Sequence, residues 1–242
     1  MRTLYKLILL LTIIYIPSSW SVIQVMPTRV ILSSDAKEET FVVRNTGGAP
    51  SLVQIWLSKI DYDGMDIRDD VPLFITPPVA RINADKNKVF RLFQMSDAST
   101  NLPSDRESAF WINIFDVPAT AEEDVNLNKL SIAFRTRIKA FYRPSTIKST
   151  LIEGAKNMKW TVEEKGDRVV LTTMNNSPYH ISFANISLYN GDESQAELPG
   201  EMVAPYSSKK FIFKNVKWQG DKKVKYNYIS DLGAFITVVF KS

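Results

Sequence analysis

Residues 128–144 read NKLSIAFRTRIKAFYRP, a run with no internal glycine or proline that exceeds the usual strand length of about 5–6 residues. Apolar side chains fall on every second position, which in a β-strand places them on one face. This row consists of Leu130, Ile132, Phe134, Thr136 and Ile138. The strand fits two arrangements. Periodicity alone favours a central strand of a two-sheet sandwich, and the alternative is a strand whose apolar row is left open for another chain.

The chain begins with a pattern typical of a secretory signal peptide. Arg2 and Lys6 precede an apolar run over residues 7–16, and small residues follow up to Ser21. The run is too short for a spanning helix, which needs about 20 apolar residues. We therefore expect a signal peptide over residues 1–21, cleavage near Ser21, and an exported product that is not inserted in a membrane.

Composition limits the possible partners and scaffolds. The chain has no cysteine, so an exported product must be held together by its hydrophobic core. The formal net charge of +4 falls to about +2 once Arg2 and Lys6 are removed, which is too balanced to suggest a nucleic-acid partner. The remaining ~220 residues fit one large or two ordinary domains.

Short alternating segments recur along the chain and helical periodicity is nearly absent, so the sequence predicts an all-β protein. About seven strands are expected before Pro144, the count and size of an immunoglobulin-like sandwich. Pro27 places the first strand on an edge or at a switch between sheets, and Pro77-Pro78 predicts a kinked crossing.

The second half predicts another sandwich without helices. Its strand candidates are residues 160–163, 168–174, 179–189, 210–213 and 234–240. Arg143-Pro144 reads as the boundary between the halves. The expected domains are residues 22–143 and 144–242, with the strand 128–142 closing the first.

The sequence gives little support for catalysis. The absence of cysteine and the single histidine, His180, argue against thiol catalysis and a histidine-rich metal site. His180 follows Pro178-Tyr179 in an apolar segment and is expected to be structural. The sequence contains neither a Gly-x-Ser-x-Gly elbow nor a phosphate-binding glycine loop. We therefore expect a protein that is not an enzyme and uses no metal or cofactor.

Several motifs resemble, in their order and spacing, the signature of the PapD-like periplasmic pilus chaperones of the chaperone–usher pathway. They are DRES at 105–108, FWIN at 110–113, IKAFYRP at 138–144, NSPY at 176–179 and YISDLG at 228–233. The resemblance covers the mature chain. It implies two immunoglobulin-like domains set in an L. It also implies a periplasmic protein that caps pilus subunits by donor-strand complementation until an outer-membrane usher takes them.

The resemblance implies roles for individual charged residues. Arg29 and Lys139 stand where the family grips the C-terminal carboxylate of the subunit, a task suited to charge-assisted hydrogen bonds. Glu107, Arg143 and Asp231 match a salt-bridge trio that sets the angle between the domains.

The apolar row is then the donated strand. Leu130, Ile132 and Phe134 are expected to fill the subunit groove, with Thr136 and Ile138 nearer the cleft. The preceding segment 119–129 is short and acidic, which resembles the short-loop subgroup that usually builds rod-like pili. An exposed apolar edge is an aggregation liability, so the free protein is also a candidate for self-capping as a dimer.

Two other functions remain open from the residues. An exported two-domain adhesin or carbohydrate-binding module would use exposed aromatics as a sugar platform, although these fit core or interdomain packing better. They are Trp160, Trp218, Tyr226 and Tyr228. An exported hydrolase is the weakest alternative, because no nucleophile has a supporting motif. The sequence names neither the subunit nor the usher.

Overall fold

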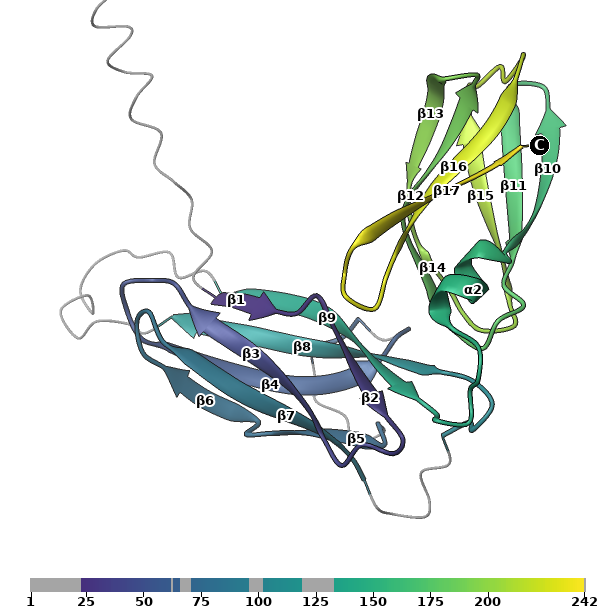
Figure 1. The fold of residues 1–242 in the computed structure, drawn as a ribbon. Coiled ribbons are helices and arrows are strands. Elements are labelled where there is room, and N and C mark those ends of the chain that lie inside the picture. Colours follow the sequence, from purple (N-terminus) through teal and green to yellow (C-terminus); the bar gives the residue numbers. More distant parts are fainter. Residues whose placement is uncertain (1–22, 62, 66–70, 96–101, 119–132, 242) are drawn as a thin grey trace, which may run out of the picture.

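The computed structural model describes residues 23–61, 63–65, 71–95, 102–118 and 133–241. These residues form two β-sandwich domains set at an angle, in an L (Figure 1). The expected signal peptide, the 119–129 loop and two members of the apolar row, Leu130 and Ile132, lie outside the described residues. Each domain has its own core, as the all-β, two-domain prediction requires.

The N-terminal domain packs a four-stranded sheet against a five-stranded sheet. The first contains, in spatial order, β1 (Ile23–Met26), β3 (Glu39–Asn45), β7 (Asn87–Gln94) and β5 (Leu73–Thr76). The second contains β2 (Arg29–Ser33), β9 (Phe134–Arg143), β8 (Ser108–Pro118), β4 (Ser51–Lys59) and β6 (Val79–Ile82). Alternate residues of both sheets point inward and close the core around fully buried side chains such as Leu32, Phe90 and Ile112.

Two segments that the sequence predicts as single strands are each split at a proline into two strands that belong to different sheets. Pro27, after a cis peptide bond, separates β1 in the first sheet from β2 in the second. Pro77, also cis, separates β5 from β6 in the same way. The switch expected at Pro27 and the crossing expected at Pro77-Pro78 are confirmed. They raise the expected count of about seven strands to the nine seen in the described residues before Pro144.

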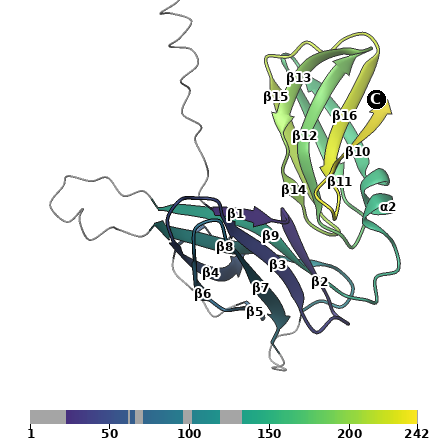
Figure 2. The same cartoon turned by 60° about the vertical axis from the view of Figure 1, so that its left-hand side comes forward.

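The C-terminal domain packs a three-stranded sheet against a five-stranded sheet (Figure 2). The first contains β10 (Lys159–Lys165), β11 (Arg168–Met174) and β15 (Ser208–Lys214). The second contains β13 (Glu193–Pro199), β12 (Ile181–Asn190), β16 (Lys222–Ile229) and β17 (Phe235–Lys241), with β14 (Met202–Val203) also on β12.

The sequence-based outline of this domain is wrong in two respects. It omits β13, the two-residue strand β14, and β16: β13 has no fully buried residue, and in β16 polar or charged residues alternate with the buried Val224, Tyr226 and Tyr228. It also predicts no helix, whereas residues Leu151–Lys156 form the short helix α2. Thr150 and Glu153 form a capping box at its start, a signal that the sequence carries at that spacing.

Strand β9 is covered unequally on its two edges. It pairs with β8 in antiparallel fashion from Phe134 to Tyr142, but with β2 in parallel fashion only from Lys139 onward. On the β2 side, residues 134–138 therefore have no strand partner among the described residues.

The apolar row of β9 is divided at the same place. Phe134 is 61% exposed and Thr136 is exposed, whereas Ile138 is 8% exposed and packs in the N-terminal core with Ala140 and Tyr142. Ile138, expected near the cleft, is therefore a core residue, and Phe134 and Thr136 are the described members of the row that remain exposed. Once β2 lies alongside β9, this face of the strand becomes the inner wall of the sandwich.

Candidate functional site

Two cations meet where the domains join. Arg29, the first residue of β2, is the register partner of Lys139 in the parallel ladder with β9. Arg29 is 6% exposed and its Nη1 donates to the carbonyl oxygen of Ile229 at 3.2 Å. Lys139 Nζ donates to Ser182 Oγ at 3.1 Å. Ile229 and Ser182 belong to the C-terminal domain, so both cations lie in the cleft between the domains.

The two cations are largely buried, and no carboxylate among the described residues neutralises them. Burial lowers the pKa of Lys139 to about 8, and the nearby charge of Arg29 adds to the effect. Burial also lowers the pKa of Arg29, against the attraction of Asp231 and Glu107. Among the described residues neither cation has an ion-pair partner, and Arg29 Nε is buried without an acceptor. The pair, which we call the cation pair, is thus arranged to bind an anion.

The two carboxylates nearest the cation pair are already engaged by Arg143. Arg143 Nε donates to Glu107 Oε1 at 2.7 Å, and its Nη1 and Nη2 bind Asp231 at 2.7 and 2.8 Å. Burial alone would lower the pKa of Arg143, but the two carboxylates outweigh it and raise that pKa. Glu107 Oε2 also accepts the backbone N–H of His180 at 2.9 Å. The trio links β8 and β9 to the tip of the β16–β17 hairpin, across the domain boundary.

The exposed half of β9 is held from the face opposite Phe134, a feature that sequence reasoning missed. Arg135 donates to the Gly64 carbonyl at 2.7 Å and to Asp63 Oδ1 at 3.0 Å, while Arg137 Nη1 lies 2.6 Å from the same carboxylate oxygen. The Arg137 guanidinium also lies over the Trp111 ring, 5.0 Å from its centroid. We call the contacts of Asp63 and Gly64 with the two arginines the Asp63 brace. The alternation of Arg135, Arg137 and Lys139 was the available signal, but nothing in the sequence placed Asp63 beside it.

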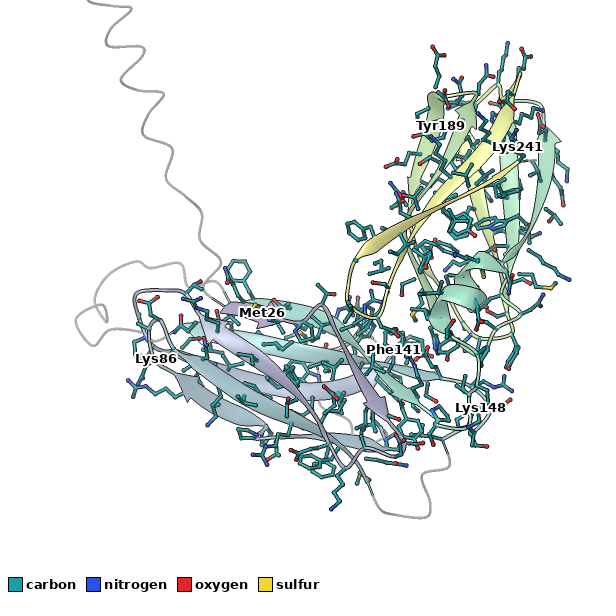
Figure 3. All side chains as sticks on the ribbon, in the orientation of Figure 1. Met26, Lys86, Phe141, Lys148, Tyr189 and Lys241 are labelled. Carbon is teal, nitrogen blue, oxygen red and sulfur yellow. The ribbon has the colours of Figure 1, made fainter. Side chains whose placement is uncertain are left out.

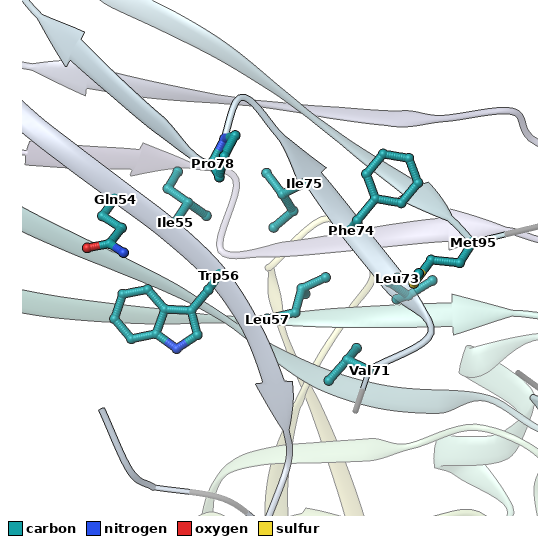
Figure 4. Close-up of a pocket in the computed structure, with 10 residues that line it drawn as sticks. All are labelled: Gln54, Ile55, Trp56, Leu57, Val71, Leu73, Phe74, Ile75, Pro78 and Met95. Carbon is teal, nitrogen blue, oxygen red and sulfur yellow. The ribbon is translucent and has the colours of Figure 1, made fainter. Parts of the chain in front are cut away.

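A separate cavity of about 280 Å³ lies beside β4 and β5, away from the cation pair (Figure 4). It is lined by Gln54, Ile55, Trp56, Leu57, Val71, Leu73, Phe74, Ile75, Pro78 and Met95. None of these lining residues is charged. The cavity therefore offers apolar contact and no group suited to acid–base, nucleophilic or metal chemistry.

The residues considered for other functions take structural positions. His180 is buried, packs against Phe141 with ring centroids 5.8 Å apart, and lies beside Glu107. Within the described ranges, no cluster of three potential metal ligands occurs and no helix is long and apolar enough to cross a membrane.

The proposed sugar platform is wrong as a surface feature. Trp218, Tyr226 and Tyr228 are at most 2% exposed, and Trp160 is half-buried among Phe183, Phe211, Tyr226 and Phe240. These aromatics form the core of the C-terminal sandwich. Tyr226 and Tyr228 alternate along β16, which is typical of side chains that face a core.

Comparison with known proteins places both domains in one protein family. Residues 22–148 match the family described as pili and flagellar-assembly chaperone, PapD N-terminal domain, and residues 153–239 match the PapD C-terminal domain. The chain is 36% identical over 222 residues to the probable fimbrial chaperone YadV of Escherichia coli K12, covering 90% of this chain and 89% of that protein.

Two further comparisons agree. The chain is 32% identical to the chaperone protein FimB/FhaD of Bordetella pertussis, over 90% of this chain and 86% of that protein. The crystal structure of the YadV chaperone superposes with a TM-score of 0.74 at 33% identity, covering 92% of this chain and all of that one.

Proposed function

This chain belongs to the family of PapD-like pili-assembly chaperones, and we propose that it captures a pilus subunit in the cleft between its domains. The observation that carries the proposal is the cation pair at the end of an uncovered strand edge. Arg29 and Lys139 are partly stripped of water and have no carboxylate partner among the residues that the structure describes, and the edge of residues 134–138 begins next to them.

The cation pair is proposed to grip the C-terminal carboxylate of the subunit. A carboxylate presents two oxygens, which suit the fork of a guanidinium and the point charge of an ammonium. Both cations already bear the cost of burial in the free protein. An incoming carboxylate therefore gains charge-assisted hydrogen bonds without having to strip water from two freely solvated side chains.

From that anchor the last strand of the subunit is proposed to run along the uncovered edge of β9. The backbone groups of residues 134–138 would supply ladder hydrogen bonds, as in other cases of strand addition. Alternate side chains of β9 would enter the subunit groove. Phe134 is the described anchor, contributing roughly 1.5–3 kcal/mol if fully buried. Leu130 and Ile132 are proposed to continue the row, and Thr136 lies between Phe134 and the cation pair.

The arginine–carboxylate trio is proposed to fix the angle between the domains and so keep the cleft open at one width. Arg143 is bound from one side by the buried Glu107 and from the other by Asp231 of the hairpin tip. A partly buried ionic trio of this kind contributes more to orientation than to net stability.

The remaining steps follow from the family. We propose that residues 1–21 are removed on export, that the chaperone acts in the periplasm without catalysis, and that an outer-membrane usher receives the loaded subunit. The exposed row also makes a self-capped dimer the proposed resting form of the free protein. The buried aromatic residues of the C-terminal domain argue against the adhesin alternative.

Co-purification tests the proposal. The chain is expressed in the periplasm with the pilin-like subunit encoded beside its gene, and a tag on the chaperone is used for isolation. A one-to-one complex is expected for the wild type, and it should be lost in Lys139→Met, which keeps the aliphatic stem but removes the charge. Lys148→Met, which removes an exposed lysine of the linker, serves as the matched control. Full recovery of the complex with Lys139→Met would contradict the carboxylate grip.

A further inference from the structure

The hairpin joining β16 and β17 carries the two most exposed of the large hydrophobic side chains in the described structure. Leu232 is 96% exposed and Phe235 is 69% exposed. Both lie in residues 229–235, which we call the hairpin tip. Figures 1 and 3 show this hairpin reaching from the C-terminal domain to the N-terminal domain. An isolated exposed leucine needs no explanation, but two large exposed hydrophobic residues on one hairpin that reaches the other domain suggest a contact surface.

The tip is held firmly on one side, which makes the exposure of the other side a fixed feature. Ser230 N–H donates to the Ala234 carbonyl at 2.8 Å, and Gly233 N–H donates to the Ser230 carbonyl at 2.9 Å. Gly233 has φ +82°, and a Cβ at this position would lie 2.6 Å from Thr28 Oγ1. Glycine therefore lets the tip close against the N-terminal domain, while Asp231 is bound by Arg143. Leu232 and Phe235 remain in solvent.

The hairpin tip reaches the cation pair through Ile229, the residue opposite Phe235. The Ile229 carbonyl lies 3.2 Å from Arg29 Nη1, and Phe235 is the cross-strand register partner of Ile229. Directly opposite residues of an antiparallel pair have Cβ atoms about 4.5–5.5 Å apart. An extended chain rises only ~3.3 Å per residue. A chain whose terminal carboxylate is held by Arg29 thus has only its last one or two side chains within reach of the tip.

We propose that the hairpin tip selects the captured chain by the side chains of its last two residues, preferring large apolar or aromatic ones. The inference rests on the carboxylate grip proposed above, with which the tip is continuous. Leu232 and Phe235 offer apolar area and no charge, and the carboxylate beside them is neutralised by the cation pair. An apolar side chain of the bound chain that covers Leu232 and Phe235 removes apolar surface of both partners from water, whereas a small polar side chain leaves the two residues in contact with water.

Peptide binding to the full chain tests this inference. The probes are fluorescein-labelled octapeptides GKVTVTLF and GKVTVTSS, each with a free C-terminal carboxylate or a C-terminal amide, measured by fluorescence anisotropy. We expect the wild type to bind the free acid ending in Leu-Phe about tenfold more tightly than the one ending in Ser-Ser. The double variant Leu232→Ser/Phe235→Ser should lose that preference and still require a free carboxylate. Val239→Ser, at another exposed apolar residue of β17, should keep it.

The outcomes separate the two proposals. If amides bind as well as free acids, the carboxylate grip fails. If free acids are required but the double variant keeps the tenfold preference, the inference about the tip is overturned. A tip that serves self-association instead would give a dimer that the double variant loses while the peptide preference is unchanged, which also overturns it. The half-life of the co-purified complex provides a second readout: replacing the last two subunit residues by serine should shorten it for the wild type but not for the double variant.

Discussion

Lys139 lies directly beside Arg29 in the parallel ladder of β9 and β2, and the two cations face the same interdomain cleft. Like charges at neighbouring positions repel, and burial adds to the cost of keeping both ionised. The protein keeps them together without a neutralising carboxylate in the described structure, because Glu107 and Asp231 are bound to Arg143. A site of this kind is unfavourable when empty and is relieved by an anion.

This arrangement predicts that capture weakens as pH rises through about 8. The pKa of Lys139 is lowered to about 8 in the free protein, and a bound carboxylate raises it again, so binding above this pH requires uptake of a proton. If Lys139 stays protonated in the complex over this range, the affinity should be about tenfold lower at pH 9 than at pH 7. Titration of subunit or peptide binding against pH measures this slope. Lys139→Arg should flatten it, and a flat wild-type profile from pH 7 to 9 would contradict the assignment.

The two ends of the described apolar row should respond differently to polar substitution. Phe134→Ser removes a 61% exposed side chain, so the free energy of unfolding should change by less than about 0.5 kcal/mol while subunit affinity falls at least about tenfold. Ile138→Ser removes a core side chain and should cost about 2–4 kcal/mol of unfolding free energy. Denaturant unfolding and complex recovery measure the contrast. A large loss of stability with Phe134→Ser would show that this residue is internal.

The members of the ionic trio should also be unequal. Glu107 is 2% exposed at its side chain, whereas Asp231 is 38% exposed. Glu107→Gln should destabilise the protein by about 3 kcal/mol, because it leaves Arg143 and the His180 N–H with a weaker buried partner. Asp231→Asn should cost about 1 kcal/mol but widen the distribution of interdomain angles. Denaturant unfolding and small-angle scattering report the two effects. Equal costs would refute the proposed difference in burial.

The Asp63 brace predicts a local change without a global one. Asp63→Asn weakens the contacts to Arg135 and Arg137, so amide hydrogens of residues 134–138 should exchange several-fold faster. The free energy of unfolding should change by less than about 1 kcal/mol, because Asp63 is exposed. Asp105→Asn, which removes an exposed pair with Arg106, is the matched control and should leave that exchange unchanged. Unchanged exchange in Asp63→Asn would show that β8 alone holds the strand.

The parts of the fold that could be predicted from sequence are those with strong local signals. Pro27 and Pro77 cannot donate to a ladder and mark the two places where the chain changes sheets. The parts that were missed have weak or competing local signals. In β16, lysines and an asparagine alternate with Val224, Tyr226 and Tyr228, so charged and polar residues make the strand hard to recognise from sequence. Helix α2 is only six residues long, too short to show helical periodicity, so the capping box was the local signal that could have predicted it.

The sequence by itself determined that the chain is built from alternating strands, and its motifs identified the two cations and the trio that meet in the cleft. Only the tertiary structure decided which part of the apolar row stays open, because that depends on how far β2 runs beside β9. It alone placed Asp63 in contact with Arg135, and brought the hairpin that carries Leu232 and Phe235 to Arg29. These relationships join segments far apart in the chain. Burial and register arise from their packing, which no local pattern of residues encodes.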